Sequence, residues 1–163
     1  MENNFRVAEL NQLGTDRLTR LFEQCVAVDR WARDLADSRP YAGLDALLTR
    51  ADELSAGLTD EEIGHALGDH PRIGERAAPG TMSATEQSGV DGVTLADRLL
   101  AANLAYERRF GHIYLVCASG RSGEELLADV AARMGNDRVT ELSVVRRELG
   151  KIARLRLERM VSA

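Results

Sequence analysis

A histidine followed directly by a proline is the first residue in this chain that could transfer a proton. His70 opens the stretch His70-Pro71-Arg72-Ile73-Gly74-Glu75, which comes after a run with helical periodicity. A proline pushes the residue before it out of the helical region, so this spacing predicts that His70 lies just past a helix end. The partial negative charge of a helix C-terminus favours the imidazolium. His70 could therefore act as an acid or a base, or it could merely help to end the helix.

An arginine interrupts the apolar stripe that is predicted for the last helix. In steps of three and four residues, the stripe runs through Leu142, Val145, Leu149 and Ile152. The next step falls on Arg156, whereas Arg154 is about 200° away around the helix and should face solvent. An unpaired buried charge is very unfavourable. Arg156 therefore indicates either an internal ion pair with a glutamate or a binding site for an anion.

Ser83 and Glu86 form the capping-box pattern that opens many helices, and Gln87 follows them. Capping alone would account for this spacing. A helix N-terminus also presents free N–H groups and a positive partial charge. On that interpretation Glu86 and Gln87 would lie beside a small pocket suited to an anion, and both interpretations remain open.

Other kinds of catalytic site are poorly supported by the residue spacing. His65 and His70 are five residues apart without an H-E-x-x-H motif, and His112 would make a scattered third ligand, so we expect no metal. The chain also lacks a nucleophile elbow, a phosphate loop and a Rossmann-like glycine pattern. Cys25 and Cys117 lie far apart in apolar contexts, which favours buried thiols over a disulfide or a zinc site.

Helical periodicity covers nearly the whole chain and predicts an all-α fold in one compact domain, residues 1–163. The expected helices span 17–28 with Asp16 as N-cap, a short segment from Trp31 that ends before Pro40, 43–55, a segment opened by the Thr59–Glu62 capping box, 93–110, 124–134 and 137–161. Only the β-branched and aromatic stretch 112–118 is strand-like, so at most one short extended segment is expected.

Composition limits the classes of function that this chain can serve. A length of 163 residues fits one domain with a real core. The net charge of -5 argues against binding to nucleic acid, which usually requires a basic surface. No apolar run is long enough to cross a bilayer, and the polar start lacks the core of a signal peptide. These features lead us to expect a cytoplasmic protein.

Taken in order along the chain, these motifs resemble one family, the 2-oxo-4-hydroxy-4-carboxy-5-ureidoimidazoline (OHCU) decarboxylases of uric acid breakdown. The motifs are His70-Pro71-Arg72-Ile73-Gly74, Ser83-x-x-Glu86-Gln87, Phe110-Gly111 followed by the apolar run 113–118, and the segment 151–157. Asn11, Trp31 and the Arg39-Pro40-Tyr41 turn are also similar to the family. The similarity covers almost the whole chain.

The resemblance implies an all-α homodimer that converts OHCU to (S)-allantoin and CO₂ without a cofactor. It implies that His70 is the catalytic histidine and that Glu86 is its acidic partner. The substrate-binding residues that it implies are Pro71, Ser83, Gln87 and Arg156. His112 stands where an apolar residue would be expected. Two other functions remain open, a non-catalytic helical interaction module and a decarboxylase of a related ureido acid.

Overall fold

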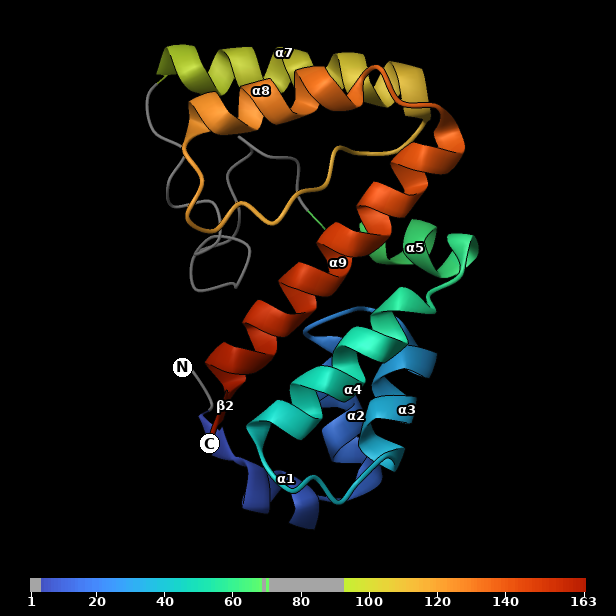
Figure 1. Ribbon diagram of the computed structural model, residues 1–163, viewed down its shortest axis with the longest axis vertical. Helices are drawn as coiled ribbons and strands as arrows, with labels where there is room; N and C mark the ends of the chain where they lie inside the picture. The colour runs from blue at the N-terminus through green and yellow to red at the C-terminus, as the bar shows by residue number, and fades with distance from the viewer. Residues whose placement is uncertain (1–3, 69, 71–92) are drawn as a thin grey trace. The chain divides into compact units, whose positions relative to one another are not determined.

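The computed structural model describes residues 4–68, 70 and 93–163, and this part of the chain is built from helices (Figure 1). The only strands among these residues form one pair, two residues each. The all-α prediction is therefore confirmed. None of the described helices combines the length and the apolar character that crossing a bilayer requires.

Contacts along the chain divide it into two compact units. Unit 1 contains Met1–Ala66 and Arg146–Ala163, and unit 2 contains Leu67–Val145. The long helix α9, Arg138–Met160, contributes its first turns to unit 2 and the rest to unit 1. The expectation of a single domain stays a prediction.

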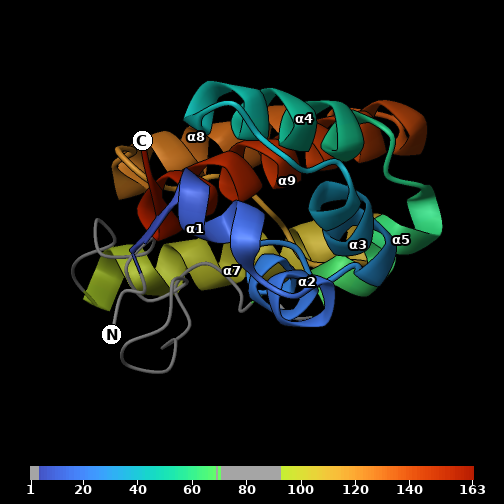
Figure 2. The same cartoon turned by 90° about the horizontal axis from the view of Figure 1, so that it is seen from below.

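Unit 1 is built on helices that pack in sequence order. They are α1 (Val7–Gln12), α2 (Thr15–Glu23), α3 (Asp29–Asp37) and α4 (Leu44–Ala56), and α5 (Asp60–Leu67) begins in this unit. Helix α3 packs against both α2 and α4, and Figure 2 shows α2 and α3 side by side. The core is closed by fully buried apolar side chains, which include Leu18, Phe22, Trp31, Leu35, Leu47 and Leu149.

The expected ends of two of these helices were wrong. Helix α2 has Gly14, and not Asp16, at its N-cap, and it ends at Glu23 well before Val28. Asp16 lies inside the first turn, where a carboxylate still stabilises the positive end of the helix. Val28 is extended and caps α3, so that helix begins two residues before Trp31. Short-range sequence signals fix the existence of a helix better than its ends.

A two-residue strand pair joins the two ends of unit 1, and no pattern in the sequence predicted it. Strand β1 (Phe5–Arg6) pairs in parallel with β2 (Val161–Ser162), so that Phe5 lies opposite Val161. Helix α9 therefore ends at Met160, one residue before the predicted end. Pairing between residues so far apart in sequence leaves no local pattern.

Unit 2 contains α7 (Val93–Phe110), α8 (Gly123–Arg133) and the start of α9. The bounds of α7 agree with the prediction, and Ser122 caps α8 by accepting a hydrogen bond from the N–H of Glu125. Helices α7 and α8 lie side by side (Figure 1). Residues 113–118 join them without forming a helix or a strand, so the strand-like pattern of this stretch does not lead to a strand.

A buried ion pair holds the segment 113–118 against the helices of unit 2. Arg133 is 4% exposed, and its Nε donates to Oε1 of the fully buried Glu141 at 2.6 Å. Its Nη1 donates to the carbonyl of Leu115, in the segment 113–118, at 2.7 Å. Tyr106 donates its hydroxyl to the same Glu141 oxygen at 2.6 Å, and Asn136 donates to the other oxygen at 3.0 Å. Every member of this cluster is thus hydrogen-bonded, as a buried polar group requires.

The protonation states of the cluster follow from this arrangement. Burial, and then the hydrogen bond to Glu141, raises the pKa of Tyr106 far above its usual value, so the phenol stays a donor. Tyr114 donates its hydroxyl to Asp129, and burial followed by this bond raises its pKa in the same way. Burial works against the charge of Arg133, but Glu141 outweighs it and raises the pKa of the guanidinium. Both phenols therefore stay neutral, and the guanidinium stays charged, across the physiological range of pH.

We expect Arg133→Met to destabilise the protein by about 3–5 kcal/mol, because it leaves Glu141 buried without its cation. The double variant Arg133→Met/Glu141→Gln should be less destabilised than the sum of its single variants, since residues in one network are non-additive. Urea unfolding monitored by circular dichroism measures these differences. The control is Arg98→Met, which breaks an exposed 3.7 Å pair with Glu124 and should change stability by about 1 kcal/mol or less. Additive effects at positions 133 and 141 would contradict this account of the cluster.

Candidate functional site

Two of the six predicted site residues, His70 and Arg156, lie in the described part of the chain. His70 belongs to unit 2 and Arg156 to unit 1. Pro71, Ser83, Glu86 and Gln87 lie outside the described residues. The gathering of all six around one substrate therefore stays a prediction.

His70 follows a helix, as the proline after it predicts. Helix α5 ends at Leu67, and the backbone N–H of His70 donates to the carbonyl of that residue at 3.2 Å. This bond uses one of the carbonyls that the end of a helix leaves without an intrahelical partner. The side chain is half-buried. His70 is thus held at a helix end and is only partly buried there.

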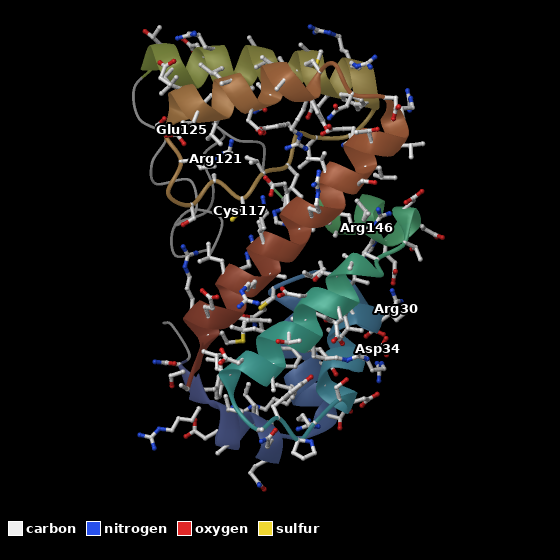
Figure 3. All side chains as sticks on the ribbon, in the orientation of Figure 1. Arg30, Asp34, Cys117, Arg121, Glu125 and Arg146 are labelled. Carbon is white, nitrogen blue, oxygen red and sulfur yellow. The ribbon has the colours of Figure 1, made fainter. Side chains whose placement is uncertain are left out.

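The start of α5 is fixed by an N-terminal capping box and by two arginines. Thr59 and Glu62 exchange the expected bonds, at 2.9 Å from the N–H of Thr59 to Glu62 and at 3.1 Å from the N–H of Glu62 to Thr59. Arg30 of α3 donates to both oxygens of Glu62, at 2.8 and 2.7 Å. Arg146 of α9 donates to the carbonyl of Leu58 at 2.9 Å. Arg30 and Arg146 are labelled in Figure 3. Side-chain hydrogen bonds therefore stabilise the N-terminus of the helix that leads to His70.

The prediction that Arg156 faces inward and Arg154 faces solvent is confirmed. Arg156 is 6% exposed, whereas the side chain of Arg154 is 42% exposed and pairs with Asp52 at 2.6 Å. Nη1 of Arg156 donates to the backbone carbonyl of Cys25, which follows α2, at 3.2 Å. A guanidinium has five donors, and the bond to Cys25 uses one of them. The choice between an internal structural role and an anion site stays open.

Other residues of the motif have structural roles in unit 1. The side-chain amide of Asn11 exchanges two 2.9 Å bonds with the backbone of Tyr41. Arg39 donates to the carbonyls of Leu10 and Leu13, at 3.0 and 2.5 Å. Tyr41 donates its hydroxyl to the carbonyl of Leu35. These bonds join the end of α1 to the turn between α3 and α4.

Trp31 marks a close approach of α4 to α9. Its indole N–H donates to the hydroxyl of Ser55 at 3.1 Å, and Ser55 donates in turn to the carbonyl of Ala51 at 2.8 Å. A Cβ atom added at Gly150 would lie 3.3 Å from that of Ser55, so the contact favours two small residues. Trp31 therefore satisfies its one polar atom inside the core, as a buried tryptophan normally does.

Sequence reasoning missed the buried Arg133–Glu141 pair, although a signal for it was present. Glu141 lies one turn before Val145 on the apolar stripe of α9, and Arg133 follows Leu126 and Val130 at helical spacing. Both residues are therefore charged groups on apolar stripes, as Arg156 is. The cysteines follow their prediction in part, since neither forms a disulfide but only Cys25 is fully buried. No group of three potential metal ligands occurs among the described residues.

Comparison with known proteins identifies the class to which this fold belongs. A solved structure of an OHCU decarboxylase in the presence of (S)-allantoin superposes with a TM-score of 0.71 at 27% identity, covering 84% of this chain and 94% of that one. The decarboxylase of Amia calva is 28% identical over 166 residues, which is 94% of this chain and 93% of the relative. The architecture is thus that of the helical OHCU decarboxylases.

The model of the OHCU decarboxylase family matches residues 11–158, and the chain belongs to that family. The uric acid degradation bifunctional protein TTL of Arabidopsis thaliana is 30% identical over 147 residues, covering 85% of this chain but 45% of the relative. This chain spans less than half the length of the bifunctional relatives that it matches, between 32% and 45%.

We expect Arg154→Ala and Arg156→Ala to differ sharply. Loss of the exposed Arg154 pair should change the free energy of unfolding by about 1 kcal/mol or less. Loss of Arg156 leaves the buried Cys25 carbonyl without this donor, which should destabilise by about 1–3 kcal/mol, and it should also lower substrate affinity or turnover. Thermal melts and kinetics on the same two proteins provide the comparison. Normal turnover with a lower melting temperature in Arg156→Ala would leave that residue only a structural role.

The ion pair at the start of α5 should make stability depend on acid pH. The guanidinium of Arg30 lowers the pKa of Glu62 from 4.5 to about 2. A lowered pKa in the folded state stabilises the fold above the ordinary pKa, and this contribution is lost as the pH falls from 4.5 towards 2. Between pH 4.5 and pH 2, the free energy of unfolding of Glu62→Gln should therefore fall less than that of the parent protein. Urea titrations at a series of fixed pH values measure this difference. Glu61→Gln, on the same exposed turn, serves as control and should follow the parent.

Proposed function

We propose that this protein converts OHCU to (S)-allantoin and CO₂ in urate breakdown, and that it works as a homodimer without an added cofactor. The match of the OHCU decarboxylase family to residues 11–158 is the observation that carries this proposal. The solved relative with (S)-allantoin present supports it. Cys25 and Cys117 form no disulfide, which fits a reducing compartment, and we propose a cytoplasmic location.

The chemistry of the substrate explains why residues of this kind would suffice. When the bond to the carboxylate breaks, its electron pair must move into an acceptor, and CO₂ leaves. The conjugated C=N and C=O groups of the OHCU ring can accept that pair, and a proton then returns to carbon. The protein must hold the ring, stabilise the developing charge and control the proton.

Each predicted residue has a role in this scheme that suits its chemistry. His70, half-buried at the end of α5, would handle the proton on the substrate hydroxyl or at the carbon that loses CO₂. Glu86 would orient His70 and bind the ureido N–H groups. The buried Arg156 would hold an anionic or carbonyl oxygen. Ser83 and Gln87 would fix the ring beside Pro71.

The decisive assay uses OHCU that is generated fresh from urate, with decay of its ultraviolet absorbance and chiral analysis of the allantoin. We expect turnover to (S)-allantoin that survives exhaustive chelation. Lys151→Arg is a matched control, because Lys151 is exposed and pairs with Glu148 at 2.9 Å, away from any role in the scheme. Turnover of a related ureido acid in place of OHCU would favour the alternative substrate. A folded protein with no turnover of either would favour a non-catalytic interaction module.

A double-mutant cycle tests the pairing of His70 with Glu86. Each single substitution, His70→Asn or Glu86→Gln, should lower turnover by about 10²- to 10⁴-fold, the usual value of an acid–base group. The double variant should be little worse than the worse single variant, because residues that act as a unit are non-additive. If Glu86 only caps a helix, its variant will instead keep normal turnover and melt at a slightly lower temperature. Normal turnover in either single variant would remove that residue from the mechanism.

A further inference from the structure

Helix α7 carries an ordered stripe of side chains on the side opposite its buried face. The buried face consists of Leu99, Asn103, Tyr106 and Phe110, each 4% exposed or less. Two residues before each of these stands an exposed one, which gives the series Asp97, Ala101, Leu104 and Arg108. A step of two residues is about 200° around a helix. The second series therefore points directly away from the core of unit 2.

This outer stripe is apolar in the middle and charged at its ends. Leu100 and Leu104 are each 40% exposed, and Val139 is the only other exposed large hydrophobic residue in the described part of the chain. Ala101 is exposed and Ala105 is half-buried. Asp97 carries the negative charge at one end and Arg108 the positive charge at the other. We call these six residues the α7 outer face.

The α7 outer face is complementary to itself when one copy is reversed. In an antiparallel pair that aligns Asp97 with Arg108 of a second copy, position 100 lies level with position 105, and position 101 with position 104. Each leucine is then level with an alanine, so large and small side chains alternate along the seam. Each end carries one negative and one positive charge. Asp97 and Arg108 are about 16 Å apart along the axis, so both pairs fit one straight helix.

We propose that the α7 outer face binds the same face of a second copy of this chain, antiparallel and about a twofold axis. A twofold interface uses one patch twice, so its charges and side-chain sizes must reverse along the patch, as they do here. An unrelated partner would impose no such relation between positions 97 and 108. The assignment names a surface for the proposed homodimer and rests on that homodimer, but not on the decarboxylation.

The size of this face sets the expected strength of association. A stripe of about three helical turns is small beside a standard interface of about 1,600 Å². We therefore expect a dimer that dissociates on dilution. Its apolar centre should supply most of the affinity, and the two charge pairs at its ends should fix the antiparallel register.

A charge swap tests the register. Asp97→Arg and Arg108→Asp each place like charges at both ends of the seam, and each should weaken dimerisation by about tenfold or more. The double variant Asp97→Arg/Arg108→Asp restores opposite charges in reversed order and should regain dimerisation to within about threefold of the parent. Sedimentation equilibrium over a concentration series measures all four proteins, with circular dichroism to verify that each is folded.

Two further variants separate the seam from general surface effects. Leu104→Glu places a charge at the apolar centre and should give a folded monomer. Val139→Glu makes the same kind of change at a residue of α9 that is 80% exposed, and it should dimerise like the parent. Dimers that persist unchanged in every variant would overturn this interface and leave the homodimer standing. A parent chain that is monomeric throughout, or a double swap that fails to recover, would also overturn it.

Discussion

Backbone carbonyls between the helices need hydrogen-bond donors, and in this protein arginine side chains supply many of them. Arg39 donates to Leu10 and Leu13, Arg146 to Leu58, Arg133 to Leu115, Arg156 to Cys25 and Arg109 to Asn136. A carbonyl at a helix end or in an extended segment has no partner in its own element. Because a guanidinium presents five donors in a rigid fork, one side chain can bind such a carbonyl and a carboxylate together. Lys151 is the only lysine in the sequence.

This use of arginine bears directly on the candidate site. Arg133 and Arg156 are both buried on apolar faces of helices, and the carboxylate of Glu141 pairs with Arg133. An internal ion pair, which is the structural alternative for Arg156, therefore does occur at another buried arginine of this chain. Burial alone does not distinguish an arginine that supports the fold from one that binds substrate. The distinction lies in whether turnover depends on the side chain beyond its effect on stability.

The helices and their faces follow largely from local sequence. The Thr59–Glu62 capping box, the bounds of α7 and the burial of Arg156 rather than Arg154 were all predictable, because they depend on residues within one or two turns. The ends of α2 and α3 were less predictable, since Gly14 and Val28 give weak signals of their own. The six site residues were predicted from the resemblance of the ordered motifs to the family. Helical periodicity independently indicated one of them, Arg156.

The sequence by itself determined the all-α class, the order of the elements, the position of His70 after a helix and the inward face of Arg156. Each of these depends on local periodicity or on the geometry of a proline. Only the tertiary structure decided which groups satisfy one another: the Arg133–Glu141–Tyr106 cluster, the bonds from Arg39 to the end of α1, and the pairing of Phe5 with Val161. Such contacts join residues far apart in the chain. A residue's local pattern shows that a buried polar group needs a partner, but the partner is chosen by the packing of the whole fold.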